Sequence, residues 1–429
     1  MTSFNSQQYL DSFTNFEINL HKLSGQEFDL GRVVGLLDFL GRPDKKLKII
    51  HVAGTKGKGS TCAFLSHVLA ASGFRVGLFT SPHLHHVHER IRVLDKAVID
   101  RGEDFAGTIT GEQLAQTVNA LRPHIAAMTN RGSFLTYFEV LTVAALYFFS
   151  RQNLDWVVLE TGLGGRLDAT NAVDSLVAVI TPISLDHTRI LGKTLEAIAV
   201  EKTGIIKSSQ QRVVAAPQDE KVMAVILNRC REFGIPPIIA DPAKYRDMAI
   251  PLKGEHQKVN AATALHVVEL LRVWGHKISD AAIAQGLKRT RWPGRFELLR
   301  KKPAVIVDSA HNRASARALA KTIMGEYPGR AVTLVLGTSS DKDIEGLAGE
   351  LKDVVSTVIL TKADHPRAYD FRPAHAGQLF PGRECFVTGN VDDALEMALS
   401  KAKKDDVIVA AGSIFIAAEV RDKINHVSV

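Results

Sequence analysis

The chain has 429 residues, of which 45% are hydrophobic and 23% charged, and its formal net charge is +7. This composition indicates a globular protein of two or three domains. Its mild positive charge is typical either of an ordinary, mildly basic cytosolic enzyme or of a surface suited to polyanionic substrates. Nucleic acid is not favoured, because no dense Lys/Arg stripe with interleaved aromatic residues is present. The three cysteines are scattered and form no CxxC pair, so they indicate neither a disulfide framework nor a thiolate metal site. Because neither a signal pattern nor a bilayer-spanning apolar run is present, we expect a reduced, cytoplasmic chain without membrane contact.

The first elements lead to a glycine-rich loop. Helices are expected around residues 8–16 and 30–40, within a helical stretch that begins at residue 7. The apolar run 47–50 predicts a strand, and residues 63–72 have helical spacing. Between them lies HVAGTKGKGST, residues 51–61, so a turn rich in glycine joins a strand to a helix.

This loop has the composition of a phosphate site. Gly54, Gly57 and Gly59 carry no Cβ, so backbone N–H groups can close around phosphate oxygens, and the following helix adds its partial positive charge. Lys58 can reach the outer phosphates and the Ser60 hydroxyl can bind Mg²⁺. The usual P-loop pattern places Ser or Thr directly after Lys, but here Gly59 intervenes. The alternative is a glycine-rich turn without a ligand.

The next two hundred residues alternate between strands and helices. Further strands are predicted at 75–80, 155–160, 176–181, 213–216 and 237–240, and further helices at 110–128, 134–150, 194–203, 219–233 and 254–274. This alternation indicates a mostly parallel sheet covered on both faces.

A second domain is expected after RWPGRF, residues 291–296, where Pro293 and Gly294 end a helix. Strands are predicted at 304–308, 331–337, 355–361 and 407–411, and helices at 314–326, 343–351 and 391–402. The fold class is therefore α/β, with a P-loop ATPase domain over residues 1–295 and a smaller Rossmann-like domain over residues 296–429. The second domain lacks GxGxxG, so it is not interpreted as a dinucleotide domain.

Two polar residues follow predicted parallel strands in the first domain. Glu160 ends one strand and His187 lies beyond another, at the sheet edge where ligands bind in open α/β folds. Glu160 is a candidate Mg²⁺ ligand, and His187 could serve a second divalent ion. Lys202, near the end of an apolar helix, reads from its pattern alone as a solvated lysine.

The loop SPHLHHVHER holds four histidines, His83, His85, His86 and His88. Such a cluster could bind zinc, but it lacks a Cys pair or an HExxH helix. A mobile polar lid over the site is the favoured interpretation.

Three polar residues lie at the ends of later elements. Arg295 could bridge the two domains across a triphosphate, and Asp308 could accept hydrogen bonds from a ribose, with His311 facing the same cleft. Asn260 lies near the start of its helix. Each of these residues could equally be a cap or a turn residue.

Together the motifs resemble the folylpolyglutamate synthase/dihydrofolate synthase family, a branch of the Mur ligase superfamily. The resemblance runs from FDLGRV to GSIFIAAEVR. It includes HVAGTKGKGST, LETGLGGRLDATN, ISLDHTRILG, EKTGIIK, GEHQKVNAATAL, WPGRFE and DSAHN. The GKGS form of the family's phosphate loop accounts for Gly59.

The resemblance implies a role for each matching residue. The implied ATP site comprises Gly54, Thr55, Gly57, Lys58, Gly59, Ser60, Asn260, Arg295 and Asp308. The implied metal ligands are Ser60, Ser81 and Glu160 for one Mg²⁺, with His187 and a CO₂-carbamylated Lys202 for a second. Ser81, Thr136, Phe138, Asp168 and His311 are the implied substrate residues, and Lys58, Lys202, Arg295 and His311 the implied catalytic ones.

The implied reaction is ATP-driven amide formation through an acyl phosphate. L-Glutamate is added to tetrahydrofolate, to 7,8-dihydropteroate or to both, and ADP and phosphate leave. A monomer is the expected state, and the C-terminal domain is expected to bind glutamate. Two alternatives stay open: a Mur-type amino-acid ligase acting on another carboxylate, and an ATP-binding regulatory protein.

Overall fold

The computed structural model describes residues 5–18 and 28–424. The middle of the stretch expected to be helical from residue 7 onward, residues 19–27, lies outside the described part. The chain forms two compact units. The first comprises residues 1–251 with 257–291, and the second comprises residues 252–256 with 292–429.

The first unit is built on a seven-stranded sheet in the order β3-β2-β4-β1-β5-β6-β7. Its strands are β1 (Ile49–Ala53), β2 (Val76–Phe79), β3 (Ile91–Leu94), β4 (Trp156–Glu160), β5 (Val177–Ile180), β6 (Arg212–Ala215) and β7 (Ile238–Ile239). Every neighbouring pair is parallel except β2 with β3. The central strands are buried along their whole length, as is expected when helices cover both faces of a parallel sheet.

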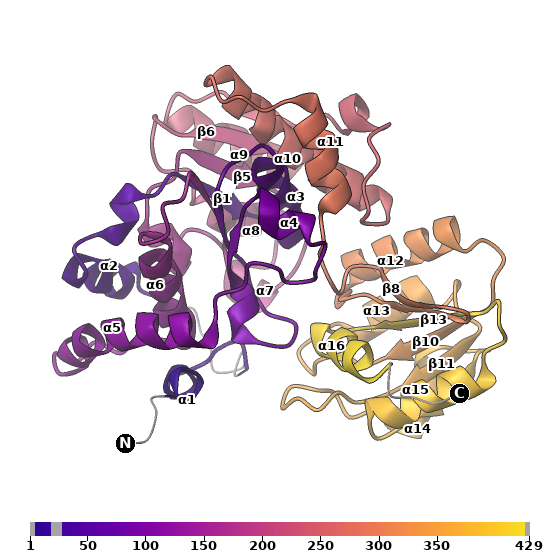
Figure 1. The fold of residues 1–429 in the computed structure, drawn as a ribbon. Helices are drawn as coiled ribbons and strands as arrows, with labels where there is room; N and C mark the ends of the chain where they lie inside the picture. Colours follow the sequence, from indigo (N-terminus) through magenta and orange to yellow (C-terminus); the bar gives the residue numbers. More distant parts are fainter. Residues whose placement is uncertain (1–4, 19–27, 425–429) are drawn as a thin grey trace. The chain divides into compact units, whose positions relative to one another are not determined.

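Helices cover the two faces of this sheet as separate layers (Figure 1). On one face α2, α5 and α6 form an apolar cluster with residues of β1, β2 and β4, and α8 and α9 form a second cluster with β5 and β6. On the other face α3 packs against β1, β2 and β4, and α11 packs on α3. The helices of this part are α1 (Ser6–Asp11), α2 (Leu30–Phe39), η2 (Pro43–Lys46), α3 (Lys58–Ala71), η3 (Val87–Arg90), α4 (Lys96–Asp100), α5 (Gly111–Thr129), α6 (Tyr137–Phe149), η4 (Ala169–Ala172), α7 (Thr188–Leu191), α8 (Leu195–Thr203), α9 (Glu220–Glu232), η5 (Pro242–Tyr245), α10 (Glu255–Val273) and α11 (Asp280–Arg289).

The second unit has a six-stranded sheet in the order β12-β11-β10-β13-β9-β8. Its strands are β8 (Glu297–Lys301), β9 (Ala304–Val307), β10 (Val332–Leu336), β11 (Thr357–Leu360), β12 (Glu384–Val387) and β13 (Val407–Ala411), and its helices are α12 (Arg313–Glu326), α13 (Ile344–Leu351), α14 (Pro373–Leu379), α15 (Val391–Lys401) and α16 (Ile414–Lys423). Only β8 and β9 pair antiparallel. The predicted fold class, two mostly parallel α/β sheets, is confirmed.

Several predicted boundaries are wrong. Strand β1 continues through His51 to Ala53, and helix α3 begins at Lys58 rather than at residue 63. Gly57 has a left-handed backbone (φ 79°), which lets the loop turn directly into the helix, and the polar run after it hides the helical pattern.

Some elements were not predicted at all. Strand β3 follows the histidine-rich segment and closes one sheet edge. The structure also contains four further elements that the sequence did not predict: strands β8 and β12 and helices α14 and α16. Strands at sheet edges carry weak apolar patterns because one side of each stays partly exposed; β8, for example, is intermediate or exposed throughout.

In the described residues, no helix combines the length and apolar character needed to cross a bilayer. The three cysteines, Cys62, Cys230 and Cys385, are all free thiols.

Candidate active site

The glycine-rich loop after β1 is shaped to receive an anion. A Cβ on Gly54 would clash with Thr181 Oγ1, and a Cβ on Gly57 would clash with the Asn260 amide, so only glycine fits at either place. Gly57 is the N-cap of α3 and supplies no side-chain hydrogen bond to the first turn of the helix. The N–H groups of that turn are therefore available to a phosphate, with the helix dipole behind them.

Hydrogen bonds to the segment after β5 also hold the loop in place. The N–H groups of Thr55 and Lys56 both donate to Pro182 O at 3.0 Å, and Thr55 Oγ1 donates to Ser184 O at 3.1 Å. Asn260, which is 3% exposed, donates through Nδ2 to Gln257 Oε1 at 2.9 Å. This bond turns the Asn260 carbonyl oxygen toward Gly57. The predicted residues Thr55, Gly57 and Asn260 therefore lie together.

Glu160 and Ser81 follow neighbouring parallel strands, β4 and β2, and meet beside this loop. Ser81 N donates to Glu160 Oε2 at 3.2 Å, and Lys58 Nζ lies 4.0 Å from Glu160 Oε1. Glu160 and Ser60 are each 4% exposed. A carboxylate and two serine hydroxyls are hard oxygen donors of the kind that Mg²⁺ takes together with phosphate, so this donor set fits the expected ion.

His187 lies on the far side of the loop, beyond β5. Its backbone is left-handed (φ 48°), and its Nε2 lies 3.8 Å from Asp186 Oδ1. Asp186 in turn pairs with Lys56, whose Nζ lies 3.1 Å from Oδ2. A histidine nitrogen beside a carboxylate oxygen also suits a divalent ion. Sequence analysis missed Lys56 and Asp186; the signal was the second lysine within the loop.

Lys202 is buried, so the expectation of a solvated lysine from its pattern alone is wrong. The side chain is 4% exposed, and Nζ donates to Gly54 O at 2.8 Å. Burial, reinforced by the charges of Lys58 and Lys56 and opposed by Asp186 and Asp168, lowers the pKa of Lys202 to about 7. The unprotonated, nucleophilic amine is therefore more populated near neutral pH than it is in an exposed lysine.

A second glycine-rich loop, residues 161–168, follows β4. Asp168 is 2% exposed, and its carboxylate accepts from Leu163 N at 2.8 Å and Thr170 N at 3.1 Å. A Cβ on Gly162 would come within 2.6 Å of Phe138 Cζ, so the ring lies directly against the loop. Phe138 also packs near Phe79.

Thr136 lies at the start of the same helix as Phe138. It is the N-cap of α6 and forms a capping box with Glu139, so its hydroxyl serves the helix. Thr136, Phe138 and the Asp168 loop come together on this side of the sheet, around Phe138.

The remaining candidates lie in the second unit. Asp308 follows β9 and accepts from Phe296 N and Ala310 N, both at 2.8 Å. Burial raises the pKa of Asp308, and the positive charge of Arg295 opposes that shift. His311 Nδ1 lies 2.8 Å from Ser309 O, which assigns its ring proton to Nδ1. Arg295, Asp308 and His311 are thus grouped at one strand end; the bridging role of Arg295 stays a prediction.

The histidine-rich segment is organised by two charged residues. Glu89 accepts backbone N–H bonds from Leu84, His85 and His86. Arg90 donates to His83 Nδ1 at 2.9 Å, and burial lowers the pKa of His83 to about 3. These contacts hold the segment in a turn, and the mobile lid expected from composition stays a prediction.

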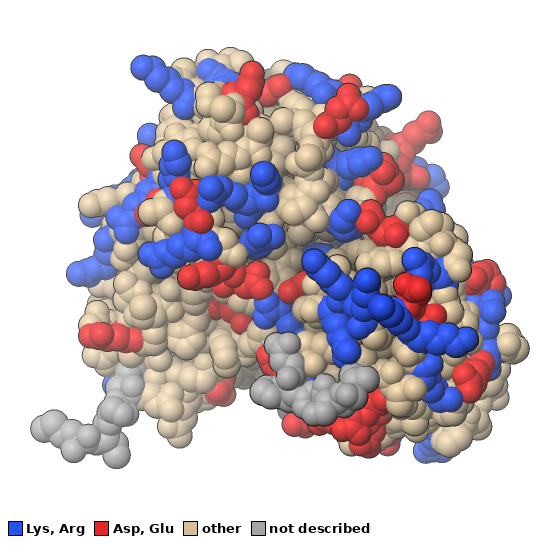
Figure 2. Space-filling model, turned by 45° about the vertical axis from the view of Figure 1, so that its right-hand side comes forward, with Lys and Arg blue, Asp and Glu red and all other residues tan. Residues whose placement is uncertain are grey.

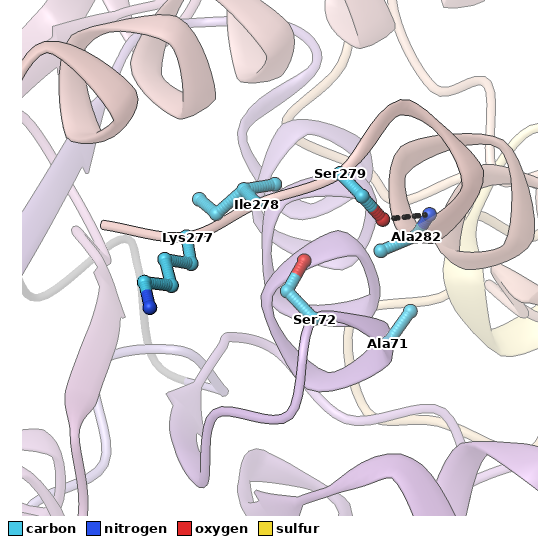
Figure 3. A pocket seen from close by; sticks show the side chains of 6 residues that line it. All are labelled: Ala71, Ser72, Lys277, Ile278, Ser279 and Ala282. Carbon is cyan, nitrogen blue, oxygen red and sulfur yellow. Dashed lines mark hydrogen bonds between the residues drawn. The ribbon is translucent and has the colours of Figure 1, made fainter. Parts of the chain in front are cut away.

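The described residues contain no competing metal centre. Within residues 5–18 and 28–424, no three His, Cys, Asp or Glu side chains are grouped to hold a metal ion; the set at Glu160 relies on hydroxyls and on phosphate instead. A shallow hollow is lined by Ala71, Ser72, Lys277, Ile278, Ser279 and Ala282 (Figure 3). It lies at the C-terminal end of α3, roughly 20 Å along the helix from the phosphate loop, and Lys277 is its one charged lining residue.

Two family models and several known proteins match this chain. Residues 52–240 match the Mur ligase middle domain, and residues 294–414 match the Mur ligase glutamate ligase domain. The chain is 32% identical to the dihydrofolate synthase/folylpolyglutamate synthase of Bacillus subtilis over 424 residues, which is 92% of this chain and 94% of the relative.

Solved structures are similar over the whole chain. One is Escherichia coli FolC in complex with DHPP and ADP, with a TM-score of 0.83, 31% identity, and coverage of 99% of this chain and 98% of that one. Another is the bifunctional folylpolyglutamate synthase/dihydrofolate synthase of Yersinia pestis complexed with AMPPNP and Mn ion, with a TM-score of 0.82, 30% identity, and coverage of 99% and 98%.

Proposed function

The chain belongs to the folylpolyglutamate synthase/dihydrofolate synthase family of Mur ligases, and on this premise we propose how its residues carry an ATP-dependent ligase reaction. The enzyme adds L-glutamate to a folate-type carboxylate, tetrahydrofolate or 7,8-dihydropteroate. One observation carries the assignment of roles: Lys58, Glu160 and the buried Lys202 converge on a loop that only glycine could form.

The loop from Gly54 to Ser60 holds the triphosphate. Its N–H groups bind phosphate oxygens, and Lys58 places its charge near the outer phosphates. Ser60, Ser81 and Glu160 would hold one Mg²⁺, and His187 with Lys202 a second. When bound, Mg²⁺ offsets the repulsion between the triphosphate and the substrate carboxylate.

Lys202 acts as a carbamate. Its neutral Nζ attacks the CO₂ carbon; a C–N bond forms as one C=O π bond opens, one N–H proton is released, and the neutral amine becomes an anionic carbamate. The lowered pKa supports this step, because only the unprotonated amine can attack. The hydrogen bond to Gly54 O keeps the buried amine in place beside the loop.

Two chemical steps follow. The substrate carboxylate attacks the γ-phosphorus, so that an acyl–phosphate bond forms and ADP leaves. The α-amine of glutamate then attacks the acyl carbon, phosphate leaves, and the amine gives up a proton as the amide forms. Arg295 stabilises the charge on the transferring group, and Asp308 and Asn260 bind the nucleotide. An acyl phosphate hydrolyses readily, so a site that excludes water is required.

The substrates divide between the domains. Residues 1–295 bind folate and the triphosphate of ATP, with Phe138 against the flat pterin ring and Thr136 and the Asp168 loop beside it. Residues 296–429 bind glutamate, and His311 serves it. Lys and Arg side chains gather in one area of the face drawn in Figure 2, a charge pattern suited to an acidic polyglutamate tail. The working form is a cytoplasmic monomer.

The test is substrate-dependent ADP release. Purified protein with ATP and Mg²⁺ is given glutamate and either dihydropteroate or tetrahydrofolate, and the products are separated by mass. We expect ADP release only when glutamate and a pterin substrate are both present, with a mass gain of one glutamyl unit. Equal ADP release without a pterin would refute the ligase assignment, and glutamylation of a different carboxylate would favour another Mur-type substrate. Comparing the two pterins also decides whether one or both activities are present.

A further inference from the structure

One polar side chain interrupts the apolar strand that carries the phosphate loop. His51 lies in the middle of β1, among Ile49, Ile50, Val52 and Ala53, and its exposed fraction is 0%. Because it is fully buried three residues before Gly54, it cannot touch ATP or folate.

His51 is joined to the second glycine-rich loop by a chain of two hydrogen bonds. Its Nε2 lies 2.8 Å from Thr170 Oγ1, and Thr170 Oγ1 lies 2.5 Å from Asp168 Oδ1. All three side chains are buried, with exposed fractions of 0% for His51 and Thr170 and 2% for Asp168.

The direction of these bonds can be assigned from the network. Burial raises the pKa of Asp168, whereas the N–H groups of Leu163 and Thr170, which donate to its carboxylate, oppose that shift and favour the ionised form. The carboxylate therefore accepts the single hydroxyl proton of Thr170, and the hydroxyl oxygen must accept from His51. His51 is then the neutral Nε2–H tautomer. Burial supports this state, since it lowers the pKa of His51 to about 3.

The same tautomer has a cost that apolar residues would avoid. It leaves Nδ1 of His51 as a buried acceptor without a hydrogen-bond partner in the described residues. A valine or isoleucine at this strand position would bury no unsatisfied atom. The polar side chain is therefore explained by its bond to Thr170 rather than by packing.

The loop that this chain anchors lies between the two halves of the site. On one side a Cβ on Gly162 would meet the Phe138 ring at 2.6 Å, and on the other a Cβ on Gly165 would meet Lys202 O at 2.7 Å. A small shift of the loop would therefore move its surface against the Phe138 ring, where the pterin is expected.

We propose that His51 is a positioning residue: through Thr170 it fixes the Asp168 loop to the strand that carries the phosphate loop, and so sets the shape of the folate side of the site. This inference rests on the proposed function and adds to it a residue that touches neither substrate. His51 acts as a hydrogen-bond donor of fixed direction, so its effect falls on folate binding and not on nucleotide binding.

Kinetics of four variants test the role. His51→Leu and Thr170→Val remove one hydrogen-bonding group each at similar volume, whereas His51→Gln can keep an N–H near the Nε2 position and Thr170→Ser keeps the hydroxyl. We expect the first pair to raise KM for the pterin substrate roughly tenfold with KM for ATP within about twofold, and the second pair to stay within about threefold of wild type. The double variant His51→Leu/Thr170→Val should have a pterin KM no higher than that of either single variant, because both substitutions break the same pair of hydrogen bonds.

Selective ¹⁵N-histidine NMR of the whole protein gives a readout that is independent of activity. The His51 resonances, assigned by their loss in His51→Gln, should report a protonated Nε2 and an unprotonated Nδ1 that do not titrate between about pH 5.5 and 8. Thr170→Val should shift the Nε2 signal.

Three results would overturn the proposal: a protonated Nδ1, an unchanged pterin KM in Thr170→Val, or equal increases of both KM values in the first pair. If the wild-type enzyme shows no pterin-dependent ADP release, the proposed function fails, and the NMR result still decides whether the hydrogen-bond chain exists as assigned.

Discussion

The two glycine-rich loops of the first unit have similar construction and opposite chemistry. They follow neighbouring parallel strands, β1 and β4, and each turns at a glycine with a left-handed backbone, Gly57 at φ 79° and Gly164 at φ 74°. Both also carry several glycines in a short span, so composition alone would assign them the same role.

The difference lies in what their N–H groups bind. After β1, Gly57 caps α3 without a side-chain bond, and Lys56 and Lys58 add positive charge. After β4, the Asp168 carboxylate already accepts from Leu163 N and Thr170 N. A glycine-rich loop can bind an external anion only where its backbone N–H groups are not already bound to a carboxylate of the same loop. Under the proposed function the first loop receives phosphate, whereas N–H groups of the second loop are already bound to a carboxylate.

Lys58→Ala should have the largest effect and sharpens this contrast. Removing the ammonium group leaves the outer phosphates without their lysine, so we expect ATP turnover to fall by roughly 10³-fold with an unchanged circular dichroism spectrum. Lys56→Ala is the matched control in the same loop, because its amine pairs with Asp186, and it should lose much less. Equal losses for the two variants would remove the distinction between them.

Lys202→Ala should come next, with a loss on the order of 10²-fold in turnover. Short carboxylates added to the variant should restore part of the activity by occupying the space of the carbamate. Reactivation of CO₂-depleted wild type by bicarbonate should be faster at pH 8 than at pH 6, since the amine, with a pKa of about 7, is protonated at the lower pH. Electron density for an unmodified Lys202 amine in a metal-bound complex would contradict the carbamate.

Lys202→Met should raise the free energy of unfolding, and the increase should depend on pH. The folded-state pKa lies below the ordinary value of 10.5, so the buried amine disfavours folding most below pH 7, and that cost disappears as pH rises toward 10.5. In metal-free, CO₂-depleted buffer we expect the variant to be more stable by ~2–4 kcal/mol at pH 6.5, with the gap shrinking by pH 10. Urea unfolding at several pH values measures the difference in free energy of unfolding between the variant and wild type. A difference that grows as the pH rises would show that burial of the charged amine does not destabilise the fold.

The paired variants Gly57→Ala and Gly164→Ala compare the loops directly. Both glycines have positive φ, so each alanine costs about 1–2 kcal/mol of backbone strain. The Gly57→Ala methyl also clashes with the Asn260 amide, so ATP affinity should fall at least about tenfold, whereas the Gly164→Ala methyl meets Leu191 Cδ2 at 3.1 Å, away from the phosphates. Calorimetric ATP titration separates the two, and similar losses of affinity would break the comparison.

Asp168→Asn should give the smallest change in turnover. It keeps the shape of the side chain but removes the charge that the loop N–H groups favour, so we expect KM for the pterin substrate to rise roughly fivefold to tenfold and KM for ATP to stay constant. Steady-state kinetics with each substrate varied in turn measures both values. A change confined to ATP would assign the second loop to the nucleotide.

Much of the fold could be predicted because its signals are local. Strands such as Trp156–Glu160 are short apolar runs, helices such as α5 begin at a capping residue, Thr110, and the Gly/Lys spacing of the phosphate loop is a pattern within a few residues. The edge strands β3 and β12 could not be predicted, because β3 has only four residues with a buried arginine, Arg92, among them, and the four residues of β12 are exposed or half-buried.

The site residues also fall into those that the sequence predicts and those that it does not. The proximity of Glu160 and Ser81 follows from strand ends sharing a sheet edge, which topology makes predictable. The burial of Lys202 against Gly54 O, 148 residues away in sequence, and the bond of His51 to Thr170, 119 residues away, depend on how distant elements pack, and no local pattern contains them. The resemblance to a family supplied the role of Lys202, whereas His51 needed the structure.

The most direct test of the central claim is calorimetric titration of AMPPNP with Mg²⁺ into wild type, Lys58→Ala and Asp168→Asn. If the first loop holds the triphosphate and the second does not, Kd should rise more than about tenfold in Lys58→Ala and stay within about twofold of wild type in Asp168→Asn. An unchanged Kd in Lys58→Ala, or a larger rise in Asp168→Asn, would contradict the account.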